Sequence, residues 1–328
     1  MTTPILTILV PTYNRSKHLE ILLRNLREEV RPVAADVVVY VSDNGSSDDT
    51  AEVIARSRED WPELRANRQA NNTAERNFVH CVRAVETRWF WFIADDDLPK
   101  RGVVAQIASL LRQHEPTLLY MQCEVMRPVT GPDQGRRVDA LRVTELSARH
   151  FARRVHVMFT FISTMVVDRE RMYQSIDGQP IDRFDNTGVV QLGWVLPPLR
   201  VPGRFLFVED RCLLATAGNN GNYAVLRIFG CNFQWVVREI FSGSARLKRI
   251  GEVVITRTSI AYLPNLVWEL RRGTLGKFDR GERVAAAMQA QLGRSLAYHL
   301  LVRPVEYLPA PLAWIVLICS KAVALSLR

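Results

Sequence analysis

Short apolar runs alternate with segments of helical periodicity along the first third of the chain. Residues 5–10, 37–41 and 88–93 are rich in β-branched and aromatic side chains, as are strands buried on both faces of a parallel sheet. Between the first two runs, four leucines from position 19 to position 26 recur on one helix face. This alternation predicts an α/β fold with a mixed, mostly parallel sheet flanked by helices.

The same patterns continue further along the chain. They predict strands at residues 64–66, 118–125, 159–167 and 205–208, and helices at residues 51–58, 74–85 and 102–114. A proline ends the first strand, and Asn14 or Ser16 is the expected cap of the helix that follows. From residue 260 onward the pattern is typical of a helical, basic extension.

The run at 88–93 ends in three adjacent carboxylates, Asp95, Asp96 and Asp97. Neighbouring acids repel one another and lose hydration at a sheet edge, so a partner of opposite charge is required. A divalent cation is the simplest one, because it takes oxygen ligands from one or two carboxylates and from phosphates. The structural alternative is a turn in which Asp97 caps a helix. We expect a site for a metal ion and phosphates.

Polar loops also follow the first two runs, at residues 11–15 and 42–50. Because parallel strands end at the same edge of a sheet, these loops and the three acids are expected to gather there, where ligands of α/β proteins bind. Neither a G-x-G-x-x-G nor a G-x-x-x-x-G-K-[ST] segment occurs, which argues against dinucleotide-binding proteins and P-loop NTPases. The alternative is a nucleotide held by carboxylates, backbone groups and a metal ion.

Three segments together resemble the motifs of the family-two glycosyltransferases, which have the GT-A fold: residues 10–15 (VPTYNR), 42–50 (SDNGSSDDT) and 94–97 (ADDD). Residues 71–77 (NNTAERN) are similar to the family's N-x-G-x-x-R-N segment, with Thr73 at the glycine position. Residues 218–223 (GNNGNY) are similar to a G-N-x-x-x-Y segment of the O-antigen, abequosyltransferase-like subgroup.

The resemblance implies a nucleotide-sugar site in which Asp97 ligates Mg²⁺ or Mn²⁺ at the diphosphate. The metal ion would neutralise charge on the departing nucleoside diphosphate. The nucleotide-binding residues that it implies are Pro11, Thr12, Tyr13, Arg15, Asp43, Asn44, Arg76, Asp95 and Asp96.

Single roles follow from the same resemblance. Pro11, Thr12 and Tyr13 would line the nucleobase pocket, and Asp95 would contact the ribose. Asp43 would accept hydrogen bonds from the base, with an Asx-turn as the structural alternative. Arg76 would face the base or the phosphates, where its planar guanidinium suits bidentate contacts, or would be a solvated helix residue.

Inverting members of the family use a carboxylate as the general base that deprotonates the acceptor hydroxyl. The usual Glu-Asp pair has no clean match around residues 188–194. Asp185 is the first candidate for this base, followed by Asp210 in the pair Glu209-Asp210 and by Asp182. The structural alternative for each is an acid that caps a loop or a helix.

Composition limits the class of protein. Of the 328 residues, 48% are hydrophobic, and 43 Lys and Arg against 34 Asp and Glu give a net charge of +9, which suits anionic partners. Nucleic acid is not expected, since the basic residues are dispersed and not interleaved with aromatic ones. Five scattered cysteines without a C-x-x-C pair fit a reducing cytoplasm, and no signal peptide is apparent.

The most apolar run of the chain spans residues 312–320. It is shorter than the roughly 18–20 residues that a spanning helix needs. An interfacial helix is expected, with Tyr307 and Trp314 at the level of the lipid headgroups. A helix that packs in the core or in an oligomer is the alternative.

The sequence thus predicts a nucleotide-sugar-binding half (1–115), an acceptor-binding half (116–258) and a basic, helical segment (259–328). The predicted protein is a cytoplasmic glycosyltransferase at the inner face of the cell membrane, in cell-surface polysaccharide synthesis. It would move a sugar, with inversion, from a UDP-type donor to a glycan or lipid-linked saccharide. A sugar-nucleotide nucleotidyltransferase and a non-catalytic scaffold remain alternatives, and a homo-oligomer is left open.

Overall fold

The computed structural model describes residues 3–70, 73–126, 137–216, 224–273 and 284–326. It divides into two compact units. The sheet unit comprises Met1–Ser147, Phe161–Arg183 and Val201–Gly218, and the helical unit comprises Ala148–Thr160, Phe184–Arg200 and Asn219–Arg328. The functional division predicted at residues 115 and 258 is a separate matter and stays a prediction.

The sheet unit is built on nine strands in the order β3-β2-β1-β4-β8-β6-β9-β5, with β7 paired to β9. The strands are β1 (Leu6–Thr12), β2 (Val37–Asp43), β3 (Arg65–Arg68), β4 (Trp89–Phe92), β5 (Leu98–Pro99), β6 (Leu118–Met126), β7 (Val143–Leu146), β8 (Met165–Asp168) and β9 (Phe205–Thr216). Strands β1 to β4 are parallel, whereas β8 runs antiparallel to both its neighbours. The predicted mixed, mostly parallel sheet is confirmed.

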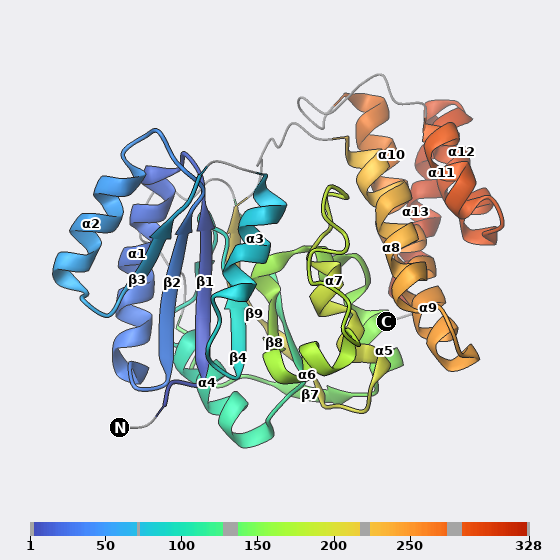
Figure 1. Cartoon of the computed structure of the whole chain (residues 1–328). Helices are drawn as coiled ribbons and strands as arrows, with labels where there is room; N and C mark the ends of the chain where they lie inside the picture. The colour runs from blue at the N-terminus through green and yellow to red at the C-terminus, as the bar shows by residue number, and fades with distance from the viewer. Residues whose placement is uncertain (1–2, 71–72, 127–136, 217–223, 274–283, 327–328) are drawn as a thin grey trace. The chain divides into compact units, whose positions relative to one another are not determined.

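Helices pack against this sheet (Figure 1). They are α1 (Ser16–Val30), α2 (Thr50–Asp60), α3 (Ala74–Arg83), α4 (Val103–His114) and α6 (Arg169–Ser175). The apolar face of α1 carries the predicted leucines, all buried in the core between helix and sheet. The strands and helices predicted before residue 126 are present within a few residues of their expected bounds.

The helical unit contains α5 (Ala148–Val155), α7 (Leu192–Val195), α8 (Phe233–Ile240), α9 (Ala245–Ala261), α10 (Leu263–Arg272), α11 (Val284–Leu292), α12 (Arg303–Tyr307) and α13 (Ala310–Ser326). Helix α9 is central to this unit, because α5, α8, α10 and α13 all contact it (Figure 1). The helical C-terminal extension is therefore confirmed. Among the helices of the described residues, none combines the length and the apolar character required to cross a bilayer.

The strand predicted at 159–167 is wrong in its first part. Residues His156–Thr160 and Ile162–Thr164 form 3-10 turns, and the strand β8 begins only at Met165. The physical reason is local: the hydroxyl of Thr160 donates to the carbonyl of Val157, and that of Thr164 to Phe161. Such bonds compete with a strand ladder and close turns instead.

One further expectation needs correction. Helix α1 is not capped by Asn14 or Ser16; instead, Asp48 from the next loop accepts a hydrogen bond from the backbone N–H of Ser16 at 2.9 Å. The structural alternative for Asp97 is not found, because Leu98–Pro99 forms β5, which pairs with β9, and Asp97 caps no helix. The strand predicted at 205–208 extends to Thr216 as β9.

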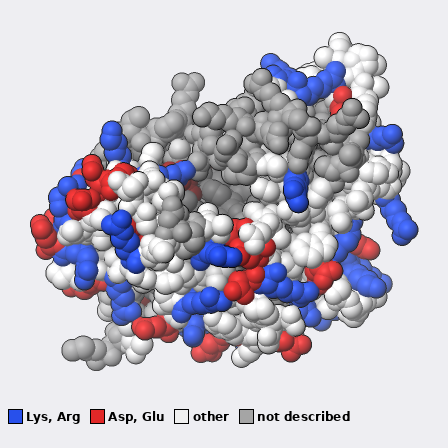
Figure 2. Space-filling view, turned by 45° about the horizontal axis from the view of Figure 1, so that its top comes forward, with Lys and Arg blue, Asp and Glu red and all other residues white. Residues whose placement is uncertain are grey.

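The two units differ in charge. The sheet unit contains 24 Lys and Arg against 27 Asp and Glu, whereas the helical unit contains 19 against 7, which together make the 43 and 34 of the whole chain. On the face in Figure 2, basic and acidic side chains are interleaved and form no single-sign patch. The net positive charge of the protein thus belongs to its helical unit.

Candidate active site

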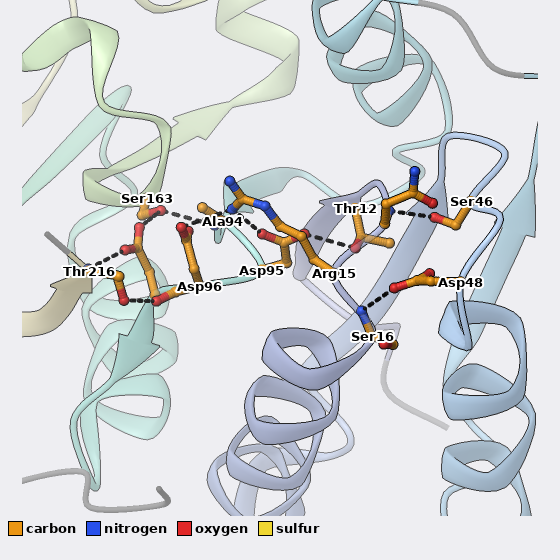
Figure 3. A network of polar contacts seen from close by, with 12 residues as sticks. Thr12, Arg15, Ser16, Ser46, Asp48, Ala94, Asp95, Asp96, Ser163 and Thr216 are labelled. Atoms are coloured by element: carbon orange, nitrogen blue, oxygen red, sulfur yellow. Dashed lines mark hydrogen bonds and ion pairs between the residues drawn. The ribbon is translucent and has the colours of Figure 1, made fainter. Parts of the chain in front are cut away.

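The C-terminal ends of β1, β2 and β4 come together, as predicted from the strand order. Thr12 at the end of β1 lies in register with Asp43 at the end of β2, and the N–H of Asn44 donates to the Thr12 carbonyl at 3.0 Å. The Thr12 hydroxyl donates to Asp95 Oδ2 at 2.8 Å, which joins β1 to the acids that follow β4 (Figure 3). Local strand patterns and parallel pairing therefore suffice to form this cluster.

The loops after β1 and β2 are locked to each other by hydrogen bonds. The N–H of Asn14 donates to Ser46 Oγ at 2.9 Å, and the N–H of Ser47 donates to Asn14 Oδ1 at 2.7 Å. Asn14 adopts a left-handed backbone conformation (φ 51°), which asparagine tolerates better than most residues. Tyr13 projects from this loop with 42% of its surface exposed. Its ring is therefore partly exposed to solvent at the strand ends.

Arg15 is the internal counter-ion of two of the three acids. Its Nη1 lies 2.9 Å from Asp95 Oδ1 and 2.8 Å from Asp96 Oδ2, and both carboxylates are buried (Figure 3). Burial raises the pKa of Asp95, although the charge of Arg15 and the hydrogen bond from Thr12 offset part of this effect. A single guanidinium thus compensates two carboxylates.

Asp97 is held differently, by neutral donors only. Its Oδ2 accepts a hydrogen bond from Ser163 Oγ at 2.5 Å and its Oδ1 accepts one from the N–H of Thr216 at 3.1 Å. The residue is 2% exposed, and no cationic side chain among the described residues pairs with it. Burial, together with the charges of Asp96 and Asp95, raises the pKa of Asp97 to about 7. A cation at this carboxylate would relieve the excess negative charge.

The carboxylate of Asp97 is an oxygen ligand of the kind that hard divalent cations take. Among the described residues, no group of three or more His, Cys, Asp and Glu is arranged to hold a metal ion by itself. Mg²⁺ and Mn²⁺ do not need such a group, because one or two carboxylates can hold them while phosphate oxygens complete the coordination shell.

No pattern in the sequence indicated that Ser163 and Thr216 belong to this site. Ser163 Oγ accepts a hydrogen bond from the N–H of Ala94 at 3.0 Å, and Thr216 Oγ1 donates to the carbonyl of Asp96 at 2.5 Å. These residues fix the backbone as well as the side chain of the acidic segment. They come from the turn before β8 and from the end of β9, so no local pattern could point to them.

The two carboxylate oxygens of Asp43 have different surroundings. Oδ1 accepts a hydrogen bond from the N–H of Ser46 at 2.9 Å, which closes an Asx-turn. Oδ2 is buried and has no hydrogen-bond partner among the described residues, with Arg68 Nε 3.6 Å away. An unsatisfied buried acceptor is costly, and an N–H group of a ligand would satisfy it.

Arg76 lies exposed in the first turn of α3. Thr73, in place of the family's glycine, is the N-cap of this helix, and its Oγ1 accepts a hydrogen bond from the N–H of Arg76 at 3.3 Å. The threonine thus gives α3 a side-chain cap. Asn71 and the segment 218–223 lie outside the described residues.

The three candidates for the general base have different surroundings. Asp182 forms an ion pair with Arg83 at 2.9 Å. Arg83 is the last residue of α3 and lies roughly 15 Å from the first turn of that helix. Asp210 is paired with Arg142 at 2.9 Å, and lies six residues before Thr216 on β9, roughly 20 Å along the strand. Asp185 is half-buried in the helical unit, where its Oδ1 accepts a hydrogen bond from the N–H of Asn186.

The surroundings of Asp210 also affect its protonation. Burial alone would raise the pKa of Asp210, but hydrogen bonds from the backbone and guanidinium of Arg142 hold it below its ordinary value. Asp182 and Asp210 both lie away from the strand ends at Asp97, next to Arg83 and Arg142 respectively.

Comparison with known proteins adds independent findings. Residues 7–170 match the profile of glycosyl transferase family 2. Abequosyltransferase RfbV of Salmonella typhimurium is 23% identical over 308 residues, which cover 88% of this chain and 90% of that protein.

Solved structures show the same fold. TarS 1–349 of S. aureus has a TM-score of 0.58 at 16% identity, and the match covers 98% of this chain and 90% of the TarS chain. Structures of TarS 1–349 in complex with UDP and with UDP-GlcNAc are also similar. The mannosyltransferase PcManGT of Pyrobaculum calidifontis, in complex with GDP-Man and Mn²⁺, has a TM-score of 0.55 at 17% identity and covers 99% of this chain with 86% of its own. The fold is of the GT-A type.

Replacement of Asp97 by Asn is expected to stabilise the metal-free protein at high pH. The folded-state pKa of about 7 exceeds the unfolded value, so the folded state binds more protons and loses stability as pH rises from about 4 to about 7. The Asp97→Asn variant should gain on the order of 2–4 kcal/mol at pH 8 and little at pH 4, measured by urea unfolding in EDTA. The matched control is Asp49→Asn, an exposed acid of the loop before α2. Equal pH profiles for wild type and Asp97→Asn would contradict this account.

Proposed function

This chain belongs to glycosyl transferase family 2 and is a glycosyltransferase of the GT-A fold. We propose that it transfers a sugar with inversion of the anomeric configuration and that this activity depends on a divalent cation. The donor is a nucleoside-diphosphate sugar, and the acceptor is a glycan or lipid-linked saccharide of a cell-surface polysaccharide. The observation that carries this proposal is the buried, uncompensated carboxylate of Asp97 beside Asp95 and Asp96 at the strand ends.

Asp97 would hold Mg²⁺ or Mn²⁺ together with the diphosphate oxygens of the donor. When bound, this ion supplies Lewis-acid stabilisation of the charge that develops on the leaving nucleoside diphosphate. Ser163 and Thr216 orient the carboxylate through their hydrogen bonds at 2.5 and 3.1 Å. Asp95, held by Thr12, would accept a hydrogen bond from a ribose hydroxyl.

The nucleobase would lie between Tyr13 and Asp43, with Pro11 and Asn44 beside it. Oδ2 of Asp43, which has no hydrogen-bond partner among the described residues, offers one buried acceptor, and this matches the single ring N–H of uracil. This favours a UDP-type donor, and the UDP complex of the similar TarS structure is consistent with it. Arg15 and Arg76 are the cationic side chains proposed for the phosphates.

We propose Asp185 as the general base. Its two rivals, Asp182 and Asp210, are engaged with arginines away from the strand ends. A base within reach of the acceptor hydroxyl would take its proton as the sugar transfers, as in other inverting glycosyl transfers.

The helical unit is proposed to provide a peripheral contact with the inner face of the membrane. Helix α13 is apolar except for Ser320, Lys321 and Ser326, and it buries Ala313, Leu317 and Ser320 within its unit. Its other side leaves Trp314, Ile315 and Ile318 each about half exposed, at 44%, 55% and 51%. The excess of Lys and Arg in the same unit suits anionic lipid headgroups.

The donor reaction tests the proposed function. Purified protein with Mn²⁺ and a panel of nucleoside-diphosphate sugars should release nucleoside diphosphate, most with a UDP-type donor. Asp97→Ala should lower the rate by on the order of 10²–10³-fold, because it removes the proposed metal ligand. Asp49→Ala is the control that removes a carboxylate from an exposed loop position.

Two other outcomes would overturn it. Pyrophosphate release from a nucleoside triphosphate and a sugar phosphate would identify a nucleotidyltransferase. Donor binding without turnover, in the presence of acceptor extracts, would identify a non-catalytic scaffold.

The proposed base is tested by single amide substitutions. Asp185→Asn should lower sugar transfer by roughly 10²–10⁴-fold and leave the Kd for UDP within about twofold, because a general base acts on the acceptor and not on the donor nucleotide. Asp182→Asn and Asp210→Asn, which remove the same charge, should retain transfer. Loss of transfer in either of these and not in Asp185→Asn would move the base to that residue.

The membrane contact is tested by co-sedimentation with vesicles that contain phosphatidylglycerol. The double variant Ile315→Ser/Ile318→Ser should lose most of its binding, since it removes two half-exposed apolar side chains from α13. Leu325→Ser, at the end of the same helix, is a single-site comparison with a smaller expected effect. Unchanged vesicle binding, or a change of oligomeric state in size-exclusion chromatography instead, would assign the exposed side of α13 to protein contacts.

A further inference from the structure

A pocket of about 550 Å³ lies within the helical unit, between α8, the N-terminal half of α9 and the end of α11 with the residues after it. Its volume falls within the roughly 300–1,000 Å³ of ligand pockets. None of the residues that we propose for nucleotide, metal ion or general base lines it. Its lining residues are Arg238, Phe241, Ser242, Lys248, Gly251, Glu252, Ile255, Thr256, Gln291, Arg294, Ser295, Leu296 and Ala297.

One side of the pocket is apolar and tightly packed. Phe241 and Ile255 are buried there, and a Cβ at Gly251 would lie only 2.9 Å from Phe241 Cβ. Helix α9 therefore approaches Phe241 as closely as its glycine permits, and this wall has little room to collapse. At the rim, Leu296 is 72% exposed, an unusual position for a large apolar side chain next to a pocket.

The other side of the pocket is cationic. Arg238, Lys248 and Arg294 line it, and among the described residues none of the three forms an ion pair with a carboxylate. Arg238 donates instead to neutral oxygens of Gln291, to Oε1 at 2.9 Å and to the backbone carbonyl at 2.7 Å. Burial lowers the pKa of Arg238. One acid, Glu252, also lines the pocket, so its lining carries a net charge of +2.

The position of Lys248 in the fold is not explained by helix stability. Arg246, Lys248 and Arg249 lie in the first turns of α9, which has Ser244 as its N-cap and no acid in its first turn. Basic residues there oppose the helix dipole, whereas an anion would be favoured at this end. The combination of a desolvated guanidinium, two further cations and an apolar wall is complementary to an anionic amphiphile.

We propose that this pocket binds a phosphorylated lipid, with its chain against Phe241, Ile255 and Leu296 and its phosphate at Arg238, Lys248 and Arg294. Two sources offer this chemistry: a phospholipid of the bilayer, and a polyprenyl phosphate of the kind that carries a lipid-linked saccharide. The binding site stands on the geometry of the helical unit alone and does not depend on the donor reaction.

The test uses the full chain and water-dispersed farnesyl phosphate below its critical micelle concentration, with farnesol and inorganic phosphate as the apolar and anionic halves. Titration calorimetry should show farnesyl phosphate binding at least tenfold more tightly than either half. The double variant Lys248→Glu/Arg294→Glu should weaken this binding by roughly tenfold or more, since it replaces two proposed phosphate contacts with repulsion. The double variant Arg246→Glu/Arg249→Glu is the matched control, with the same charge change at positions that do not line the pocket.

A vesicle experiment distinguishes the two sources. Phosphatidylcholine vesicles are compared with vesicles that also contain phosphatidylglycerol or a polyprenyl phosphate. Pocket-dependent binding to the second kind identifies a bilayer phospholipid, and to the third kind alone a polyprenyl carrier.

Three results would overturn the proposal: no binding of farnesyl phosphate, equal binding of farnesol, or equal weakening by the two double variants. Circular dichroism and acceptor-independent release of nucleoside diphosphate serve as checks on folding of the pocket variants. Because lipid binding is measured without sugar transfer, a failure of the proposed enzyme reaction leaves the outcome for the pocket unaffected.

Discussion

Three adjacent carboxylates buried at the end of β4 are the constraint on which the rest of the site depends. Like charges this close destabilise the folded state unless each finds a partner, and the protein supplies two kinds. Arg15 compensates Asp95 and Asp96, whereas Asp97 receives only hydrogen bonds from Ser163 and Thr216. Burial, together with the charges of Asp96 and Asp95, raises the pKa of Asp97. The carboxylate with the least compensation is the one best suited to a cation that arrives with its phosphates.

Hydrogen bonds between the loops after β1 and β2 hold the backbone next to these acids. Backbone N–H groups after β1 and β2 are satisfied by side chains of the opposite loop, through Asn14, Ser46 and Asp48. These bonds fix the backbone on both sides of Tyr13 and Asp43 without occupying the free oxygen of Asp43. A site arranged in this way needs little reorganisation when a nucleotide binds, so less binding free energy is lost to ordering.

The two units differ in the chemical groups that they offer to an anion. The sheet unit is slightly acidic and offers carboxylates, backbone groups and the guanidinium of Arg15 at its strand ends. The helical unit carries the excess of Lys and Arg and offers its cations directly, beside apolar surface on α13 and in the pocket at α9. Nucleotide phosphates suit the first chemistry, and lipid phosphates suit the second.

The sequence by itself determined the parallel sheet and the edge at which Thr12, Asp43 and Asp95 meet, because buried parallel strands appear as continuous apolar runs and all end on one side. The strand predicted at 159–167 is wrong in its first part, because the hydroxyls of Thr160 and Thr164 close turns that a hydrophobicity pattern does not reveal. The partners of Asp97 were decided only by tertiary structure. Ser163 and Thr216 lie 66 and 119 residues away from it along the chain, and long-range hydrogen bonds leave no periodic signal in a sequence.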